Sequence, residues 1–391
     1  MAIEFETLNK LLEIEKRQVL FDKILDNLRE YSNAEHINYD LFETSEGNIP
    51  VITISKYSDI SEVKNIKVFV GAQHNEYNGL FGILEVLKLI KEKKIIIEDI
   101  LLNNQVLIFL PLMNPYGFLN PGKDNKSGYY LKNGTNLNRY WRRTFAPEYQ
   151  NFNDDHNEYP IPEHAEIVKK ILQPYWEHEH IKIYILDFHE TSLIRRGLMD
   201  LSLNLQKESI TYNFDHVYKE IIILNILKMY NIPYYHKPLF KKCGRNPNHT
   251  HIQLSMKQLD KVYEKLLLYI TNNDDKLSFY FCYSERGKSY CQKLADLVYN
   301  KLKERNILWE TCYPSIDHQH VYHGCIVLMN DATSRPNVFS MEIESHKQFF
   351  NLFEEIEKSK SIPNYFNEKL ESINMSIELV VESIKEMITL F

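Results

Sequence analysis

Several features that would place this chain in a special class of protein are absent. Its 391 residues contain only five cysteines, an odd number with no Cys-x-x-Cys pair. Disulfide-stabilised secreted proteins need paired cysteines, so we expect reduced thiols and a cytoplasmic protein. There is no run of about 18 uncharged apolar residues, and the N-terminus has no basic head followed by an apolar stretch. We therefore expect neither a membrane span nor a signal peptide.

Clustered positive charge is also absent. Lysine and arginine total 46 against 53 acidic residues, a net charge of −7, and no long basic run occurs. Non-specific nucleic-acid binding depends on clustered basic side chains, so we expect no nucleic-acid partner. The composition that remains, 44% apolar and 25% charged, is that of a globular protein with a sizeable core.

Apolar periodicity predicts strands that alternate with helices. The predicted strands are residues 37–42, 51–54, 68–71, 106–112, 181–188, 326–329 and 337–343, and the predicted helices are 5–31, 80–93, 163–172, 347–358 and 365–390. Residues 114–135 and 154–162 are rich in Pro, Asn, Asp and Gly and are expected to be loops. The alternation predicts an α/β sheet with helices on both faces.

Three parts are expected along the chain. Residues 1–60 supply an N-terminal helix and edge strands, residues 61–345 form the main domain, and residues 346–391 end the chain as helices. Within the main domain, residues 192–310 have a mainly helical pattern, at 218–230, 256–271 and 289–306. We interpret this stretch as a helical insertion, part of which could thread back into the sheet.

Polar side chains follow the predicted strands in four places. In open α/β sheets, binding sites form where strands end. The four groups are Gln73, His74 and Glu76; Asn114-Pro115; Asn136-Leu-Asn138-Arg139; and Asp187-Phe-His189. Taken singly, each has an ordinary structural interpretation: a histidine after a strand is usually not a ligand, and Asn-Pro is usually a turn.

The order of the four groups along the chain favours a functional site over these ordinary structural roles. A neutral donor and a glutamate lie three residues apart, and a histidine follows more than 100 residues later. Three such ligands with a fourth position left to water are typical of a catalytic zinc. A separate segment with Cys243, His249 and His251 has no accompanying carboxylate and is interpreted as a structural loop.

In this order the motifs resemble those of the zinc metallocarboxypeptidases. The match extends from about residue 66 to 345, and its motifs are Asn114-Pro-Tyr-Gly117, Asn136-Leu-Asn-Arg139, Asp187-Phe-His189 and Ser340-Met-Glu342. The resemblance implies a mixed, mostly parallel sheet, a catalytic domain at residues 61–345 and one Zn²⁺ per chain. It also implies His189 and Glu76 as metal ligands.

The first metal motif departs from the family pattern. Glu76 keeps its spacing to Gly79, so the family's histidine position falls on Gln73. We favour Gln73 as the ligand, with His74 as the alternative if one residue has been deleted. Carboxypeptidases that trim peptidoglycan in curved and helical bacteria are similar in using Gln there. An amide oxygen is a weaker zinc ligand than imidazole, so metal affinity should fall.

The resemblance also implies roles for residues around the metal. Glu342 would be the general base, with Glu344 two residues on as its competitor. Asn138 and Arg139 would hold the substrate's carboxylate, to which the planar fork of arginine is matched.

The remaining roles have weaker candidates. Lys132 would polarise the scissile carbonyl, and Tyr322 would close over the substrate. Asp187 and Asn136 would orient metal ligands or simply cap strand ends.

The function expected from the resemblance is removal of a C-terminal residue from a peptide, with peptidoglycan fragments and modified peptides among the candidates. A second reading is a deacylase or amidase acting on a small N-acyl amino acid, as in the aspartoacylase branch. A third is a non-catalytic pseudoenzyme that keeps only the carboxylate grip. In each case the partner is a small molecule or peptide with a free carboxylate.

Overall fold

The computed structural model describes residues 4–101, 103–122, 128–145, 160–191, 287–302, 335–346 and 365–390, with short segments between residues 211 and 314. Its main strands are β1 (Ile37–Thr44), β2 (Gly47–Ile54), β3 (Asn65–Ala72), β4 (Gln105–Leu112), β5 (Lys182–Thr191), β9 (Leu277–Tyr283), β10 (Ile307–Trp309), β11 (Tyr313–Pro314) and β12 (Val338–His346). Three more, β6 (Thr211–Tyr212), β7 (Tyr235–Pro238) and β8 (Thr250–Gln253), form a separate small sheet.

The main sheet has the order β1-β2-β4-β3-β5-β12-β9-β10, with β11 paired to β9. Its centre, β4-β3-β5-β12, is parallel, whereas β1, β2 and β9 join antiparallel neighbours. The expected mixed, mostly parallel sheet is confirmed. Because parallel strands need a long crossover, each central connection carries a helix.

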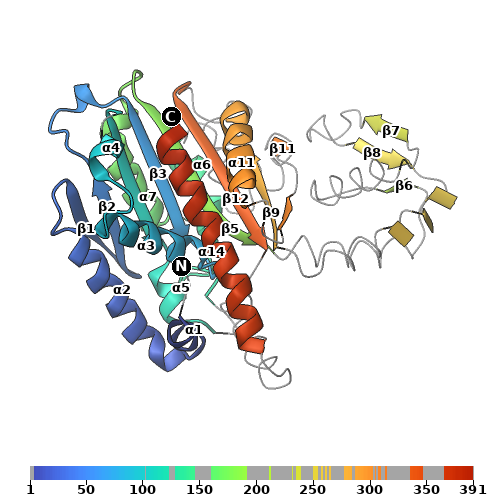
Figure 1. Cartoon of the computed structure of the whole chain (residues 1–391), viewed down its shortest axis with the longest axis horizontal. Coiled ribbons are helices and arrows are strands. Elements are labelled where there is room, and N and C mark those ends of the chain that lie inside the picture. Colours follow the sequence, from blue (N-terminus) through green and yellow to red (C-terminus); the bar gives the residue numbers. More distant parts are fainter. Residues whose placement is uncertain are drawn as a thin grey trace.

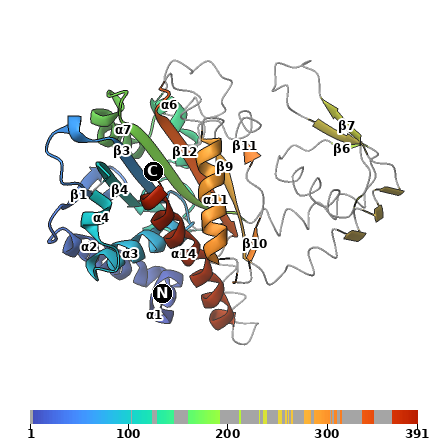
Figure 2. The ribbon, with the colours of Figure 1, turned by 45° about the horizontal axis from the view of Figure 1, so that its top comes forward.

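The helices are α1 (Phe5–Leu12), α2 (Arg17–Tyr31), α3 (Asn78–Lys91), α4 (Ile97–Leu101), α5 (Pro115–Leu119), α6 (Trp141–Phe145), α7 (Glu163–Trp176), α11 (Lys288–Leu302) and α14 (Tyr365–Leu390). Short 3₁₀ turns are η1 (Ile14–Lys16), η2 (Ile60–Glu62) and η3 (Leu137–Arg139). Helices α3, α11 and α14 cover one face of the sheet and α7 lies behind it (Figures 1 and 2), which confirms helices on both faces.

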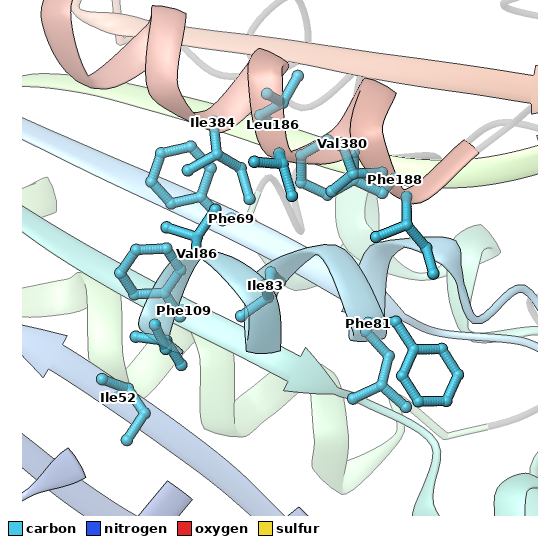
Figure 3. Close-up of a cluster of buried hydrophobic side chains, with 14 of the residues drawn as sticks. Ile52, Phe69, Phe81, Ile83, Val86, Phe109, Leu186, Phe188, Val380 and Ile384 are labelled. Carbon is cyan, nitrogen blue, oxygen red and sulfur yellow. The ribbon is translucent and has the colours of Figure 1, made fainter. Parts of the chain in front are cut away.

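The core lies between β5, α3 and α14. Leu186 and Phe188 of β5 meet Val380 and Ile384 of α14 over the sheet (Figure 3). Helix α3 approaches closely because it has glycine at the contact: a Cβ on Gly82 would lie 2.2 Å from Val380 Cγ1. Successive strand side chains point to opposite faces, so Asp187 and His189 face away from this core.

The structure corrects the single helix predicted for residues 5–31. The chain leaves the helix at Glu13, whose backbone is extended (φ −94°, ψ 108°), and α2 starts at Arg17. The Arg17 side chain replaces the lost backbone bond, because its Nε donates to the Leu11 carbonyl at 2.7 Å. The two shorter helices can then follow different parts of the core.

One loop prediction is also corrected. Residues 115–119, expected in a loop, form α5, because Asn114 accepts the Gly117 N–H and Pro115 starts the helix. For residues 192–310 the mainly helical interpretation left open that part of the stretch returns to the sheet, and β9 does so by pairing with β12. Helix α11 (Lys288–Leu302) overlaps the predicted 289–306 and starts one residue earlier, and α14 matches the predicted 365–390.

Several predicted elements lie outside the described residues. They are the helix at 218–230, the strand at 326–329 and the helix at 347–358, and only fragments of 256–271 are described. Among the helices that are described, none combines the length and apolarity needed to cross a bilayer.

Candidate metal centre

The parallel pairing of β5 and β12 brings four ionisable side chains together on one face of the sheet. Asp187 lies opposite Glu342 and His189 lies opposite Glu344. One potential ligand atom each of Asp187, His189 and Glu342 lies within 4.8 Å of the other two, and all three residues are buried. The apolar run of β5 carries these polar groups into the interior, because their neighbours in the strand belong to the core.

The His189 imidazole is held at both nitrogens. Its Nδ1 is 2.8 Å from Glu76 Oε2, and its Nε2 is 2.9 Å from Asp187 Oδ2. Burial by itself lowers the pKa of His189, but the charges of Asp187 and Glu342 and the hydrogen bonds to Asp187 and Glu76 together raise this pKa well above its usual range. The imidazole is thus the cation of the cluster when no metal is bound.

Gln73 lies on the Nε2 side of the same imidazole. Its Nε2 is 3.4 Å from His189 Nε2 and donates to Asp187 Oδ2 at 2.5 Å. Its Oε1 accepts the indole N–H of Trp141 at 2.8 Å. The turn after β3 therefore brings Gln73 and Glu76 to the histidine, as the sequence predicts.

Glu76 is also held by the backbone of β5. Its Oε2 accepts the Glu190 N–H at 3.2 Å, and Glu190 Oε1 in turn accepts the Asn78 N–H at 2.9 Å. A carboxylate at the first turn of a helix is stabilised by the unpaired amides and the dipole there. Glu190, which directly follows His189, thus ties the start of α3 to β5.

Buried Glu342 and half-buried Glu344 form a pair of interacting carboxyl groups. Burial raises the pKa of Glu342, whereas the charge of His189 opposes that shift. Burial, followed by the negative charge of Glu342, raises the pKa of Glu344 well above its usual range. Glu344 Oε2 has no hydrogen-bond partner.

The segment Asn136–Arg139 also reaches His189. Asn136 caps η3 by accepting the Asn138 N–H, and Asn138 Nδ2 lies 3.3 Å from His189 Nε2. Arg139 is half-buried and its charge lowers the pKa of Glu342, although burial outweighs this effect. The segment is therefore placed to present a positive charge beside the carboxyl cluster.

His74 also lies next to His189. Its ring is 5.6 Å from that of His189 and stacks on Tyr129 at 4.2 Å between ring centroids. Burial lowers the pKa of His74 to about 3, so the ring is neutral, and its Nδ1 donates to the Tyr129 carbonyl at 3.0 Å. Its Nε2 is then the nitrogen with a lone pair, and His74 remains the alternative to Gln73.

Of the two weaker candidates, Lys132 and Tyr322, the structure describes only Lys132, which it does not bring to the cluster around His189. Lys132 is exposed, and its backbone N–H donates to Glu46 in the β1–β2 turn at 2.8 Å. Tyr322 lies outside the described residues.

Sequence reasoning missed Trp141, Glu190, Asn78 and Tyr129. Burial raises the pKa of Tyr129 to about 12, and the charge of Glu76 adds to the shift, so its phenol is neutral beside the cluster. Only Glu190 had a local signal, since it directly follows the candidate ligand His189.

The residues present fit a bound divalent cation. Three buried carboxyl groups, those of Glu76, Asp187 and Glu342, and the carboxyl group of half-buried Glu344 surround one imidazole. Three nearby acceptor oxygens, Asp187 Oδ1, Asn138 Oδ1 and Glu344 Oε2, have no hydrogen-bond donor. Buried acceptors are normally paired, so this concentration of unpaired oxygens and negative charge suits a metal ion. Oxygen and imidazole donors are compatible with zinc.

Comparisons with known proteins concern the fold. No protein-family model matches the chain, and neither does any curated protein. Similar solved structures include bovine thrombin-activatable fibrinolysis inhibitor in complex with tick carboxypeptidase inhibitor, at 12% identity and a TM-score of 0.47, covering 95% of this chain and 96% of that one.

Two bacterial structures are also similar. One is a metallo-carboxypeptidase from Pseudomonas aeruginosa in complex with (2-guanidinoethylmercapto)succinic acid, at 10% identity and a TM-score of 0.43, covering 94% of this chain and 69% of that chain. The other is a metallo-carboxypeptidase from Burkholderia cenocepacia, at 10% identity and a TM-score of 0.39, with coverages of 93% and 68%.

Proposed function

We propose that this chain is a zinc-dependent hydrolase of the metallocarboxypeptidase type, which removes a C-terminal residue from a peptide. The observation that carries the proposal is the buried cluster around His189, where four carboxyl groups meet one imidazole and unpaired acceptor oxygens. A structural role alone gives no reason to bury so many acids together, because each costs free energy unless it is compensated.

The sequence-derived ligand set is Gln73, Glu76 and His189. Glu76 faces Nδ1 of His189 whereas Gln73 faces Nε2, so this set would hold one metal ion only after the imidazole turns. Bound there, a zinc ion supplies Lewis acidity towards a carbonyl and acidity to a water. Asp187 orients this set, because it accepts hydrogen bonds from Gln73 and lies against His189. Asp187, His189 and Glu342 are a second possible set of metal ligands, which shares His189 with the first. Substitution of Asp187 distinguishes the two ligand sets.

Glu342 is the proposed general base. It is buried, and one of its carboxylate oxygens lies within 4.8 Å of potential ligand atoms of His189 and Asp187. It takes a proton from the attacking water and delivers it to the leaving amine nitrogen. Arg139 and Asn138 bind the terminal carboxylate of the substrate, which selects the last peptide bond.

The test is a hydrolysis screen of the zinc-loaded protein. Substrates are peptides ending in L- or D-amino acids, the same peptides with an amidated C-terminus, and N-acyl amino acids. We expect cleavage of free-carboxylate peptides and none of their amidated forms. Preferential cleavage of N-acyl amino acids would replace the carboxypeptidase by a deacylase, and inactivity on all three would support a carboxylate-binding protein.

A further inference from the structure

Arg17 is a buried charged residue that the proposed reaction does not use. It is 2% exposed, and its Nε donates to the Leu11 carbonyl at 2.7 Å. Its Nη1 donates to the Tyr77 hydroxyl at 3.1 Å and to the Phe118 carbonyl at 2.8 Å. All three acceptors are neutral, and among the residues that the structure describes no carboxylate forms an ion pair with Arg17. Because burial of a charge without an opposite charge costs free energy, stability alone does not explain an arginine at this position.

Tyr77 connects Arg17 to the metal centre. It lies between Glu76 and helix α3, its backbone is not helical (φ −98°, ψ 0°), and its side chain makes no capping hydrogen bond. The residues that normally fix the start of a helix are Ser, Thr, Asp and Asn, whose side chains bond the first free amides. Here the hydroxyl of the residue before the helix binds Arg17 instead. The turn that carries Glu76 therefore depends on neighbouring segments, and Arg17 supplies one of the contacts.

Two aromatic rings hold the guanidinium of Arg17. Its carbon Cζ lies 5.5 Å from the ring centroids of both Tyr77 and Phe118, and these two rings pack edge to face at 5.3 Å. Cation–π contacts are strongest where the cation is desolvated, as it is here. Phe118 belongs to α5, which follows the Asn114-Pro115 turn. One side chain of the N-terminal helices thus joins the turn after β3 to α5.

We infer that Arg17 is a positioning residue of the metal centre, which acts through Tyr77 on the adjacent Glu76. The inference rests on the proposed function and deepens it. Glu76 Oε2 lies 2.8 Å from His189 Nδ1, so in either ligand set Glu76 binds the metal or orients the imidazole that does. The N-terminal helices, which precede the stretch that resembles the carboxypeptidases, are therefore part of the support of the site.

The experiment measures the zinc affinity of the metal-free full chain by calorimetry, with zinc alone as the probe. The variants are Tyr77→Phe, Arg17→Met and the double variant. Loss of a residue that is hydrogen-bonded to a metal ligand typically weakens metal affinity by about 10- to 100-fold. Because Arg17 acts through Tyr77, we expect the lower end of this range, about tenfold, in each single variant. The double variant should bind zinc no more weakly than Arg17→Met, because both changes break the same hydrogen bond.

Tyr57→Phe is the matched control. It also loses a hydroxyl hydrogen bond, to the Leu101 carbonyl at 2.8 Å, but near the start of β4, whereas the cluster follows the ends of β3 and β5. We expect its zinc affinity to equal that of the wild type. Unchanged zinc affinity in Tyr77→Phe would overturn the inference even if the free energy of unfolding falls, because a purely structural contact predicts that result. Equal losses in Tyr57→Phe and Tyr77→Phe, or additive losses in the double variant, would also contradict it.

Arg17→Met can fail to fold, because it also removes the hydrogen bonds to Leu11 and Phe118. Tyr77→Phe keeps Arg17 and both of those bonds, so its zinc affinity then decides the question alone. A wild type that binds no zinc would overturn the proposed function and the inference together. Zinc binding that is equal in the wild type and in Tyr77→Phe would overturn the inference alone.

Discussion

The two faces of β12 bury polar groups of different character. On one face, Glu342 and Glu344 join the cluster around His189, with oxygens that have no donor. On the other face, Ser345 bonds Asn78 Nδ2 at 2.7 Å and lies 2.9 Å from Ser376 Oγ of α14. The second group is neutral and internally hydrogen-bonded, so burial costs it little. The first group consists of ionisable carboxyl groups, and Glu344 Oε2 has no hydrogen-bond donor, so this face offers acceptor oxygens that a cation could bind.

Among the substitutions considered, Glu342→Gln should have the largest effect on the rate of hydrolysis. The substitution is nearly isosteric and removes the base, so kcat should fall by about 10²–10⁴-fold while zinc binding and the fold are retained. Steady-state hydrolysis and calorimetric zinc titration measure the two properties separately. Glu344→Gln is the matched control on the same strand; loss of activity there, with wild-type rates in Glu342→Gln, would assign the base to Glu344.

Arg139→Gln tests the positive charge beside the cluster. A hydrogen bond from a charged group to the substrate carboxylate is lost, so kcat/KM for free-carboxylate peptides should fall by about 10- to 100-fold. The comparison is the ratio of rates on free and amidated peptides, which should approach one in the variant. An unchanged ratio would show that Arg139 does not read the carboxylate.

Asp187→Asn tests whether Asp187 orients the ligands or binds the metal itself. Substitution of a residue that only orients metal ligands typically weakens metal affinity by about 10- to 100-fold. We expect that decrease in calorimetric zinc titrations, with one ion still bound at saturation. Complete loss of zinc in this variant, together with retention in Gln73→Ala, would identify Asp187, His189 and Glu342 as the ligand set.

The smallest effect is expected for a substitution on the other face of β12, among the neutral hydrogen-bonded groups of Ser345, Asn78 and Ser376. Ser376→Ala removes one partner of Asn78 and Ser345, so the free energy of unfolding should fall by about 1 kcal/mol while zinc affinity is unchanged. Urea denaturation and zinc titration give the two values. Ser383→Ala is the control in the same helix, since Ser383 Oγ bonds only Leu379 within α14 among the described contacts. A tenfold change in zinc affinity for Ser376→Ala would remove the distinction between the faces.

Residues that directly follow apolar strands could be predicted from the sequence. The runs that form β3 and β5 end in Gln73 and Asp187, and parallel pairing places such ends at one edge of the sheet. Contacts made by side chains from irregular segments could not be predicted, because no period records them. Trp141 meets Gln73 across 68 positions in the chain, and Lys132 points to the surface although its neighbours reach the site.

Strand β9 is absent from the strands predicted by the sequence for a second reason. Its seven residues, LSFYFCY, are a short apolar and aromatic run inside a segment with helical periodicity on both sides. Short apolar runs do not distinguish a buried strand from part of a helix, and only the pairing of β9 with β12 makes this one a strand.

The most direct test of the metal centre is the zinc content of the purified protein and of His189→Ala. Each is stripped with a chelator, reloaded with zinc, dialysed and measured by elemental analysis, with circular dichroism to confirm that the fold is retained. Because His189 contacts both Glu76 and Asp187, every proposed ligand set includes it. We predict one zinc ion per chain in the wild type and none in folded His189→Ala. A wild type without zinc, or a variant that keeps a full equivalent, would contradict the proposed metal centre.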